Sequence, residues 1–195
     1  MAATLSEIAG ALEARFTGRI ENRTEFRGET TLTVAPAALH DLLRHCRDHL
    51  GFDYLIDLSS VDHFGEDPRF ELVYELYSLQ HRNHLRIKSR LEETAPEAPT
   101  ATDLWPTADW HEREVFDMMG IRFAGHPDLR RILMWEGYPY FPLRKDFPLE
   151  GRDSTVPEVA FTAPAPLEGG PFVTLPSDAG SREREPRSRG AIIPE

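Results

Sequence analysis

The 195 residues of this chain include only one cysteine, Cys46. A lone cysteine cannot form an internal disulfide, and zinc and iron–sulfur sites need several ligands that one thiol does not supply. We predict that Cys46 is a small helix residue without a redox role. The chain therefore offers no cysteine site for a metal cofactor.

Basic residues are also scarce. The sequence has 22 lysines and arginines against 33 acidic residues, which gives a formal net charge of −11. Nucleic-acid binding requires a basic patch that releases counterions from the phosphate backbone. A chain with this balance repels that backbone, so we expect no nucleic-acid partner.

Long apolar runs are absent. No stretch of 18 or more apolar residues occurs, so the sequence predicts no transmembrane helix. The start, MAATLSEIAGALEARF, lacks the basic segment followed by an apolar stretch that marks a secretory signal. We expect a protein that is made and kept in the cytoplasm.

A glycine-rich phosphate-binding loop is missing too. The tight pair Gly169 and Gly170 lies in a proline-rich segment and does not follow a strand. The chain also shows no βαβ repetition. The sequence therefore gives no evident place for a nucleotide cofactor.

Two amphipathic helices are predicted near the start of the chain. Apolar side chains recur at intervals of three and four over residues 5–16, with Thr4 or Ser6 as a possible N-cap. Pro36 opens a second helix with the same spacing, which ends before Gly51.

Strand-like segments follow. Alternation predicts a strand over 30–34, and the runs 54–64, 69–80 and 84–91 are joined by short turns, so they predict an antiparallel meander. A third helix is expected at 110–119. This order predicts an α+β fold, a two-layer domain with helices on one face of a mixed, mainly antiparallel sheet, followed by an extended C-terminal segment.

Composition divides the chain into three predicted parts. Residues 1–120 form the α+β domain, 121–156 an interface segment and 157–195 a proline-rich tail. Within the first part, 92–103 contains two prolines and few large apolar groups, so we expect it to cross the surface as extended chain.

The predicted tail allows two interpretations. Repeated prolines remove any helical or strand period from 157–195, which favours disorder. The apolar segments at 159–161 and 170–175 instead suggest anchors that become ordered on another protein.

The helix at 110–119 has recognisable ends and two distinct faces. Asp109 is a plausible N-cap with Glu112 three positions on, and Gly120 is a natural stop. A helical wheel places the apolar side chains on one arc and the polar ones on the opposite arc. The apolar arc comprises Val115, Phe116, Met118 and Met119, and the opposite arc comprises Trp110, Arg113, Glu114 and Asp117. The second arc is either a solvated face or a surface that meets something else.

The segment after this helix mixes charges, aromatics and prolines. Exposed ion pairs stabilise a protein only weakly, whereas ion pairs buried between proteins fix register and partner choice. Interface cores favour arginine and aromatic residues. The cations are Arg130, Arg131, Arg144 and Lys145, and the interleaved aromatics are Trp135, Tyr138, Tyr140, Phe141 and Phe147.

Catalytic or metal-binding roles for these residues have less support from the sequence than an interface role. Glu112 and Glu114 are two positions apart on a helix and point away from each other, so they cannot flank one substrate bond. His45 and His49 have the spacing of a helical metal pair but lack a third ligand nearby. His126, which precedes Pro127, is more readily a turn residue that hydrogen-bonds the backbone.

The residue types of a hydrolase active site occur together in one predicted strand. Ser59, Ser60, Asp62 and His63 are close in sequence but show no nucleophile elbow. Adjacent strand positions face opposite sides of a sheet, so these side chains do not form a triad.

Two stretches carry a resemblance to a known family. WHEREVFDMMGIRFAGHPDLRRIL, at 110–133, followed by PLRKDFPL, at 142–149, resembles the signature of the 30 kDa subunit of respiratory complex I and of its counterpart in bacterial NADH-quinone oxidoreductase. The match is dense over about forty residues. The α+β order upstream is compatible with that family.

The resemblance implies a peripheral-arm subunit beside the 49 kDa subunit and the iron–sulfur subunits that deliver electrons to quinone. It implies no cofactor in this chain, with FMN and iron–sulfur clusters in partner subunits, and an indirect membrane association on the cytoplasmic side of the inner membrane. No catalytic, cofactor-binding or metal residue is expected. The motif positions expected at the partner interface are Trp110, Glu112, Arg113, Glu114, Asp117, Gly120, His126, Pro127, Asp128, Arg131, Arg144, Lys145, Asp146 and Phe147.

The chain departs from the family pattern in two places. The segment WEGYPYFPLRKDF carries an additional aromatic and proline piece, Tyr138 to Phe141, relative to the shorter link expected in the family, and the tail after Gly151 matches only loosely. Two alternatives stay open. One is the equivalent subunit of a related membrane-bound hydrogenase or dehydrogenase, and the other is a free-standing hydrolase or metal enzyme that uses His126, Asp128 and Glu114.

Overall fold

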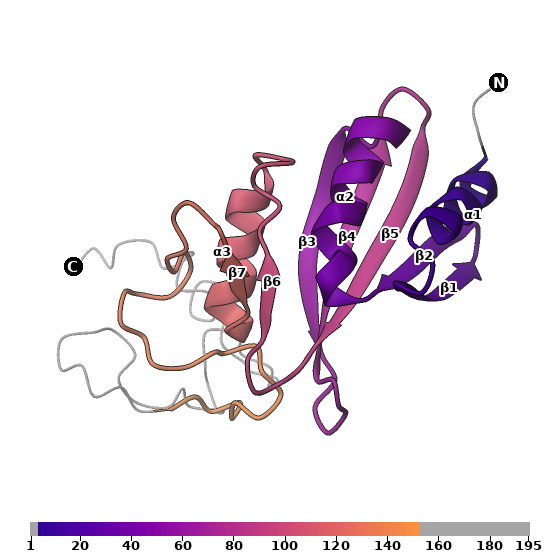
Figure 1. Cartoon of the computed structure of the whole chain (residues 1–195). Helices are drawn as coiled ribbons and strands as arrows, with labels where there is room; N and C mark the ends of the chain where they lie inside the picture. Colours follow the sequence, from indigo (N-terminus) through magenta and orange to yellow (C-terminus); the bar gives the residue numbers. More distant parts are fainter. Residues whose placement is uncertain (1–3, 153–195) are drawn as a thin grey trace, which may run out of the picture. The chain divides into compact units, whose positions relative to one another are not determined.

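The computed structural model describes residues 4–152. The chain divides into two units, residues 1–146 and 147–195. The predicted tail at 157–195 and its apolar segments lie outside the described residues. The elements of the first unit, drawn in Figure 1, are α1 (Leu5–Arg15), β1 (Ile20–Phe26), β2 (Glu29–Val34), α2 (Pro36–Leu50), β3 (Tyr54–Asp62), β4 (Phe70–Ser78), β5 (Asn83–Leu91), β6 (Glu97–Pro99), α3 (Ala108–Met119) and β7 (Arg122–Ala124).

Both N-terminal helices begin as their sequences predict. The Thr4 side chain accepts from the Glu7 backbone N–H and the Glu7 side chain accepts from the Thr4 N–H, so a capping box starts α1. Pro36 occupies the first turn of α2, and Gly51 ends this helix in the left-handed conformation at φ 72°. The predicted apolar faces of both helices are buried.

The central sheet has the strand order β1-β2-β5-β4-β3. β3, β4 and β5 pair antiparallel in sequence, as the predicted meander requires. β2 runs parallel to β5, and β1 runs antiparallel to β2. The sheet is therefore mixed and mainly antiparallel, and the predicted α+β class is confirmed.

The first strand of the β1–β2 hairpin, β1, was not predicted from the sequence. Most of β1 is exposed, so its residues show no alternation of apolar and polar types. Arg27 and Gly28, with φ 53° and 83°, form the two-residue turn that joins the strands. Such turns usually carry asparagine or aspartate before glycine, and an arginine there gives no comparable signal.

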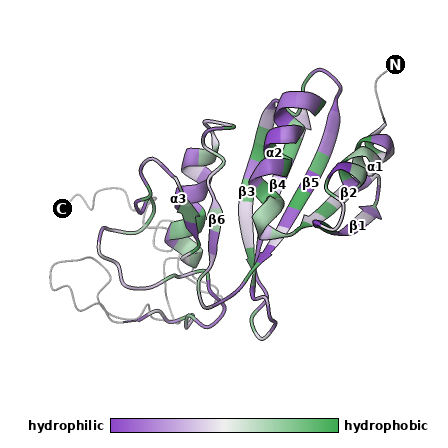
Figure 2. Ribbon diagram, in the orientation of Figure 1, coloured by the Kyte–Doolittle hydropathy of each residue, from purple (hydrophilic) through white to green (hydrophobic). Residues whose placement is uncertain are grey.

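One face of the sheet supplies most of the core. Leu72, Tyr74 and Leu76 of β4 lie beside Leu85 and Ile87 of β5, and all five side chains are fully buried. α1 contacts β2 and β5, and α2 contacts β5 and β6. Hydrophobic and hydrophilic stretches both occur along β5, as expected for a strand with one covered face (Figure 2).

The other positions of β4 and β5 carry a ladder of charges. Lys88 donates to Glu71 at 2.7 Å, and Arg86 pairs with Glu75 on the neighbouring strand and with Glu29 of β2. These pairs are partly exposed, so their main effect is to fix the register of the strands.

The linker predicted at 92–103 is only partly an extended surface chain. Its residues Glu97–Pro99 form β6, which pairs parallel with β7. Ala98 and Ala101 are buried, because this short second sheet packs against the core. The expectation of a surface crossing is wrong for these residues, whose small side chains fit where larger ones would not.

α3 differs from its prediction at one end. The N-cap is Thr107, and no side chain caps the helix, so the predicted cap at Asp109 is wrong. Glu112 does not close a capping box because its carboxylate is used elsewhere. Gly120 ends the helix at φ 74°, as predicted. Val115, Met118 and Met119 of the predicted apolar arc are buried, and α3 contacts β3 and β7.

Candidate functional site

The carboxylate of Asp117 holds the segment that follows β7. Its Oδ2 accepts from the backbone N–H groups of Ile132, Leu133 and Met134 at 3.0, 2.7 and 2.8 Å, and Arg131 donates to Oδ1 at 2.5 Å. Burial by itself raises the pKa of Asp117, but these donors outweigh burial and hold the pKa below its ordinary value. Asp117 is therefore a buried, charged anchor for residues 131–134.

Arg131 extends this anchor to the aromatic segment. Its guanidinium donates to the Asp117 carbonyl at 2.9 Å and to the Tyr140 carbonyl at 3.1 Å. The same group lies 5.6 Å from the ring centre of Tyr138 and 5.1 Å from that of Phe141. One arginine thus fixes the path of the chain from α3 to residue 141.

Glu112 joins α3 to the residues just after β6. Its side chain is fully buried and accepts from the Thr100 hydroxyl and the Ala101 N–H, both at 2.6 Å. The Tyr74 hydroxyl is buried without a hydrogen-bond partner among the described residues, and the Glu112 charge raises the pKa of this phenol beyond the effect of burial. Burial raises the pKa of Glu112 itself from 4.5 to about 7.

His126 is the turn residue that its sequence position suggests. Its Nδ1 accepts from the Asp128 N–H at 3.0 Å, so the ring proton is on Nε2. Nε2 lies 3.3 Å from the Asp109 carbonyl oxygen and 3.9 Å from Glu112 Oε2. The ring is completely buried and acts as a bridge between α3 and the turn after β7.

A second ionic cluster centres on Arg69, whose side chain is only 2% exposed. The guanidinium donates twice to Asp62 at 2.8 Å, to Glu93 at 2.6 Å and to Asp146 at 2.5 Å. The Lys145 N–H also donates to Asp62, at 2.8 Å. The hydrogen bonds that Arg69 donates to Asp62, and then those to Asp146 and Glu93, raise the pKa of Arg69, so this arginine stays charged. The cluster attaches the end of the first unit to the β3–β4 hairpin.

Gly120 allows Arg144 to lie against the end of α3. A Cβ at Gly120 would come within 2.6 Å of both Arg144 Nη2 and the Phe141 ring. Arg144 donates to the Met119 carbonyl at 2.7 Å and lies 4.6 Å from the ring centre of Phe141 and 5.0 Å from that of Phe70. The close approach is possible only because residue 120 has no side chain.

Other side chains of the same stretch point outward. Trp110, Leu133 and Leu143 are 62%, 62% and 58% exposed, and Glu114 is also exposed. These four residues are called the motif surface. Two hollows open on this stretch, one of about 310 Å³ lined by Arg113, Arg130 and Arg131 and another of about 230 Å³ lined by Ser59, Glu114 and Leu143.

The motif positions therefore fall into two groups. The predicted outward position of Asp117 is wrong, because the chain's own residues 131–134 cover that part of the polar arc. Positions that tie the chain to itself are Glu112, Arg113, Asp117, Gly120, His126, Arg131, Arg144 and Asp146. Exposed positions are Trp110, Glu114, Pro127, Asp128 and Lys145. Phe147 belongs to the second unit.

Sequence reasoning missed Arg69 and Thr100, and it considered Asp62 only as part of a hydrolase-like set. Arg69 and its partners come from segments far apart in sequence, so no local pattern joins them. The sequence holds one sign of a buried role for Arg69. This arginine directly precedes the apolar strand that starts at Phe70, and arginines are rarely buried so close to a core unless they are paired.

The residues of the hydrolase alternative are used otherwise or lie apart. His126 faces Asp109 and Glu112, whereas Glu114 lines the hollow beside β3. Asp62 is held by Arg69, and the His63 ring lies 3.6 Å from Glu71. Within residues 4–152, no cluster of three or more histidine, cysteine, aspartate or glutamate side chains is arranged to bind a metal. No helix in these residues combines the length and apolar character needed to span a membrane.

Similar proteins are known. Relative to an NADH-quinone oxidoreductase subunit from Rhizobium meliloti (strain 1021), this chain is 48% identical over 160 residues, which are 81% of this chain and 87% of the relative. A solved structure of the trypsin-resistant fragment of Nqo5 is similar at 28% identity with a TM-score of 0.59, over 65% of this chain and 100% of the fragment. A chain of an archaeal membrane-bound sulfane sulfur reductase shares the fold, with a TM-score of 0.64 and 23% identity over 74% of this chain and 85% of that one.

A family model agrees with this likeness. It describes the 30 kDa subunit of respiratory-chain NADH dehydrogenase and matches residues 32–153. These residues include the meander, α3, the Asp117 anchor and the Arg69 cluster. The resemblance drawn from 110–133 and 142–149 thus extends over most of the first unit. The chain belongs to the 30 kDa subunit family of respiratory-chain NADH dehydrogenases.

Proposed function

We propose that this chain is a docking subunit of an NADH-quinone oxidoreductase. In this proposal it binds the 49 kDa subunit and the iron–sulfur subunits and supports their electron transfer to quinone without reacting itself. FMN and the iron–sulfur clusters belong to the partner subunits. Membrane association is indirect, through these partners, on the cytoplasmic side of the inner membrane.

One observation carries the proposal. Three large apolar side chains, Trp110, Leu133 and Leu143, are exposed on a stretch whose backbone is held by Asp117 and Arg131. Exposed apolar groups on a fixed scaffold are typical of interaction surfaces, because binding then orders few additional residues. The buried motif residues give the surface its shape, and the exposed ones are available for contact.

The charges around the surface support a protein partner. Arg113 stacks on Trp110 at 5.2 Å and also donates to the Arg130 carbonyl at 3.2 Å. Tryptophan and arginine are the residue types that contribute most often to binding energy at interfaces. A partly exposed pair of this kind favours a partner that covers it.

Copurification tests the proposal. Leu133→Ser and Leu143→Ser remove exposed apolar groups, and the matched control is Leu79→Ser, which changes a leucine that is 63% exposed in the turn directly after β4. We expect each motif-surface variant to lower recovery of the 49 kDa and iron–sulfur subunits by about fivefold or more, since an interface hot spot contributes over 1 kcal/mol. The control should recover the partners fully.

The same experiment separates the alternatives. Normal assembly of both variants, with a loss only of turnover, would contradict the docking role and favour a direct part in the reaction. If the recovered partners are subunits of a hydrogenase or of a dehydrogenase with another electron donor, the chain is the equivalent subunit of a related assembly. Metal-dependent or hydrolytic activity of the isolated chain would support the alternative of a free-standing hydrolase or metal enzyme.

A further inference from the structure

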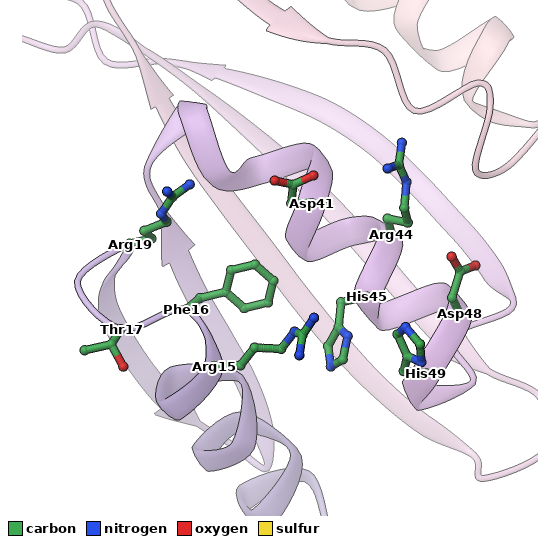
Figure 3. Close-up of a pocket in the computed structure, with 9 residues that line it drawn as sticks. All are labelled: Arg15, Phe16, Thr17, Arg19, Asp41, Arg44, His45, Asp48 and His49. Atoms are coloured by element: carbon green, nitrogen blue, oxygen red, sulfur yellow. The ribbon is translucent and has the colours of Figure 1, made fainter.

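A cavity of about 490 Å³ lies between the end of α1 and the helix α2. Neither helix contributes a residue to the motif surface. Figure 3 shows Arg15 and His45 pointing toward one another across it, with the Phe16 ring between the two helices. Its lining residues are Arg15, Phe16, Thr17, Arg19, Asp41, Arg44, His45, Asp48 and His49. The chain has a net charge of −11, so a cavity lined by this many cationic and imidazole groups is a local exception.

Two of the arginines in this cavity have no ionic partner in the part of the chain that the structure describes. Among residues 4–152, neither Arg15 nor Arg19 pairs with a carboxylate, although Arg15 lies 5.9 Å from the Phe16 ring centre. Arg44 is different, because Asp103 lies 3.7 Å away and Figure 3 shows its side chain pointing away from His45. Arg15 and Arg19 are thus exposed residues that line the cavity without a carboxylate partner within residues 4–152.

The acidic residues of the cavity do not neutralise these arginines. Asp48 accepts from Arg47 at 2.6 Å, so its charge is already compensated. The negative charge of Asp41 offsets one of the two positive charges of Arg15 and Arg19. These three side chains therefore leave one positive charge in excess before any histidine is protonated.

The imidazole of His45 has an unused nitrogen. Its Nδ1 is buried and has no hydrogen-bond partner in the described part of the chain. The ring lies 4.7 Å from that of His49 and 6.0 Å from that of Phe16. Burial, then the charge of Arg15, then His49 lower the pKa of His45, and Asp48 opposes them. A bound anion in the cavity would oppose the effect of the Arg15 charge on this ring.

A purely structural role explains only part of the arrangement. Arg15 lies in the last turn of α1 and His49 in the last turn of α2, where positive charge stabilises a helix end. This effect does not account for Arg19, which follows α1 and lines the same cavity. Two arginines that line one cavity beside two histidines are explained if the cavity holds a negative group.

We propose that the cavity between α1 and α2 binds a phosphate group, with Arg15 and Arg19 on one side and His45 and His49 on the other. Two arginines and two imidazoles present more donors than the two oxygens of a carboxylate use, whereas a phosphate has enough acceptor oxygens for all four. The volume exceeds that of a free phosphate ion, so a phosphate ester also fits. Its source is either a soluble small molecule or a phospholipid headgroup.

The test is an NMR pH titration of the histidine ring signals of the full chain. It is run in sodium phosphate and in sodium chloride at equal ionic strength, because screening alone changes histidine titration. We expect the midpoint of His45 to rise by about 0.5 pH units or more in phosphate. Equal midpoints in the two salts would overturn the proposal.

Variants locate the effect. Arg15→Gln combined with Arg19→Gln should abolish the phosphate-dependent rise, whereas Arg122→Gln, which changes an exposed arginine of β7, should retain it. Circular dichroism checks that all variants are folded. A rise that persists in the double variant would also overturn the proposal, because the phosphate would then bind elsewhere.

Two further arms identify the source of the phosphate. Adenosine monophosphate serves as the soluble ester, and vesicles of phosphatidylglycerol in phosphatidylcholine present the lipid headgroup, with pure phosphatidylcholine vesicles as control. Either response, if lost in the double variant, supports the proposal and names the source. Binding of an acidic peptide such as polyglutamate without any response to phosphate would contradict it, because the site would then recognise a protein.

Discussion

Among single residues, Gly120 combines two constraints that can be separated by experiment. It has φ 74° and a close approach of Phe141 and Arg144, whereas Gly137 has φ 83° and no heavy atom within 4 Å of the position that an added methyl group would take. Gly120→Ala should lower the free energy of unfolding by about 2–4 kcal/mol, from left-handed strain plus overpacking. Gly137→Ala should cost only about 1–2 kcal/mol from strain. Urea unfolding of both variants measures the difference, and equal losses would show that Phe141 and Arg144 move away freely.

Glu112 makes stability depend on pH. The pKa of this carboxyl is raised from 4.5 to about 7 in the folded chain, so the folded state retains a proton that the unfolded state has released. Its contribution is fully present below pH 4.5 and is lost as pH rises to about 7, by roughly 3 kcal/mol. Glu112→Gln keeps the shape of the side chain and removes the titrating group.

The corresponding measurement compares unfolding free energies at pH 5 and pH 8. Relative to the parent chain, Glu112→Gln should gain stability at pH 8 and show little change at pH 5. Glu114→Gln changes an exposed carboxyl two residues away and should keep the parent's pH profile. A parent-like pH profile in Glu112→Gln would mean that Glu112 is already ionised at pH 5.

Among the elements, α3 depends on its polar residues as much as on its apolar ones. Asp117→Ala removes the acceptor of three backbone N–H groups and leaves Arg131 without its carboxylate. We expect a loss of about 3–5 kcal/mol, the range for breaking a buried ion pair. Asp128→Ala is the control, because Asp128 pairs with Arg130 on the surface and such pairs contribute about 0–1 kcal/mol.

Protease sensitivity reports the same change locally. In Asp117→Ala, cleavage after Arg130 or Arg131 by trypsin should become faster before the rest of the first unit is cut, because the segment loses its anchor. Unchanged cleavage there would show that other contacts suffice to hold residues 131–134.

The elements that sequence reasoning identified share a local signal. α2 has an initial proline, a heptad-like apolar face and a terminal glycine, and the meander has alternation with short turns, so both were predicted. β1 was missed because it lies exposed at the edge of the sheet, and β6 and β7 because each has only three residues. Short strands are specified by their partners, which a linear reading does not contain.

The candidate site was predicted in content but not in arrangement. The stretch around α3 was recognised from residue types, yet Asp117 and Glu112 were not predicted to lie inside the fold. A helical wheel assumes that polar side chains face outward, and here the later residues 131–134 supply the donors that compensate a buried carboxylate. Compensation between segments far apart is a tertiary property, so it has no sequence period.

For the molecule as a whole, Cys46 offers a probe of global opening. It is the only cysteine of the chain, it is completely buried in α2, and burial raises the pKa of its thiol to about 12. The thiolate is the reactive form, so the folded chain should react with iodoacetamide at least a hundredfold more slowly than the chain in urea. Mass spectrometry of the quenched reaction measures the ratio. Rapid alkylation in native buffer would mean that α2 detaches without complete unfolding.

The ionic cluster of Arg69 has a consequence for synthesis of the protein. Asp146 lies 77 residues after Arg69, and Glu93 lies 24 residues after it. At about 5–20 residues per second, the ribosome adds Asp146 roughly 4–15 s after Arg69. During this interval the nascent chain has Arg69 with only Asp62 and Glu93 as partners. The β3–β4 hairpin can therefore form early, while its fastening to the end of the first unit is completed only as the last residues of that unit emerge.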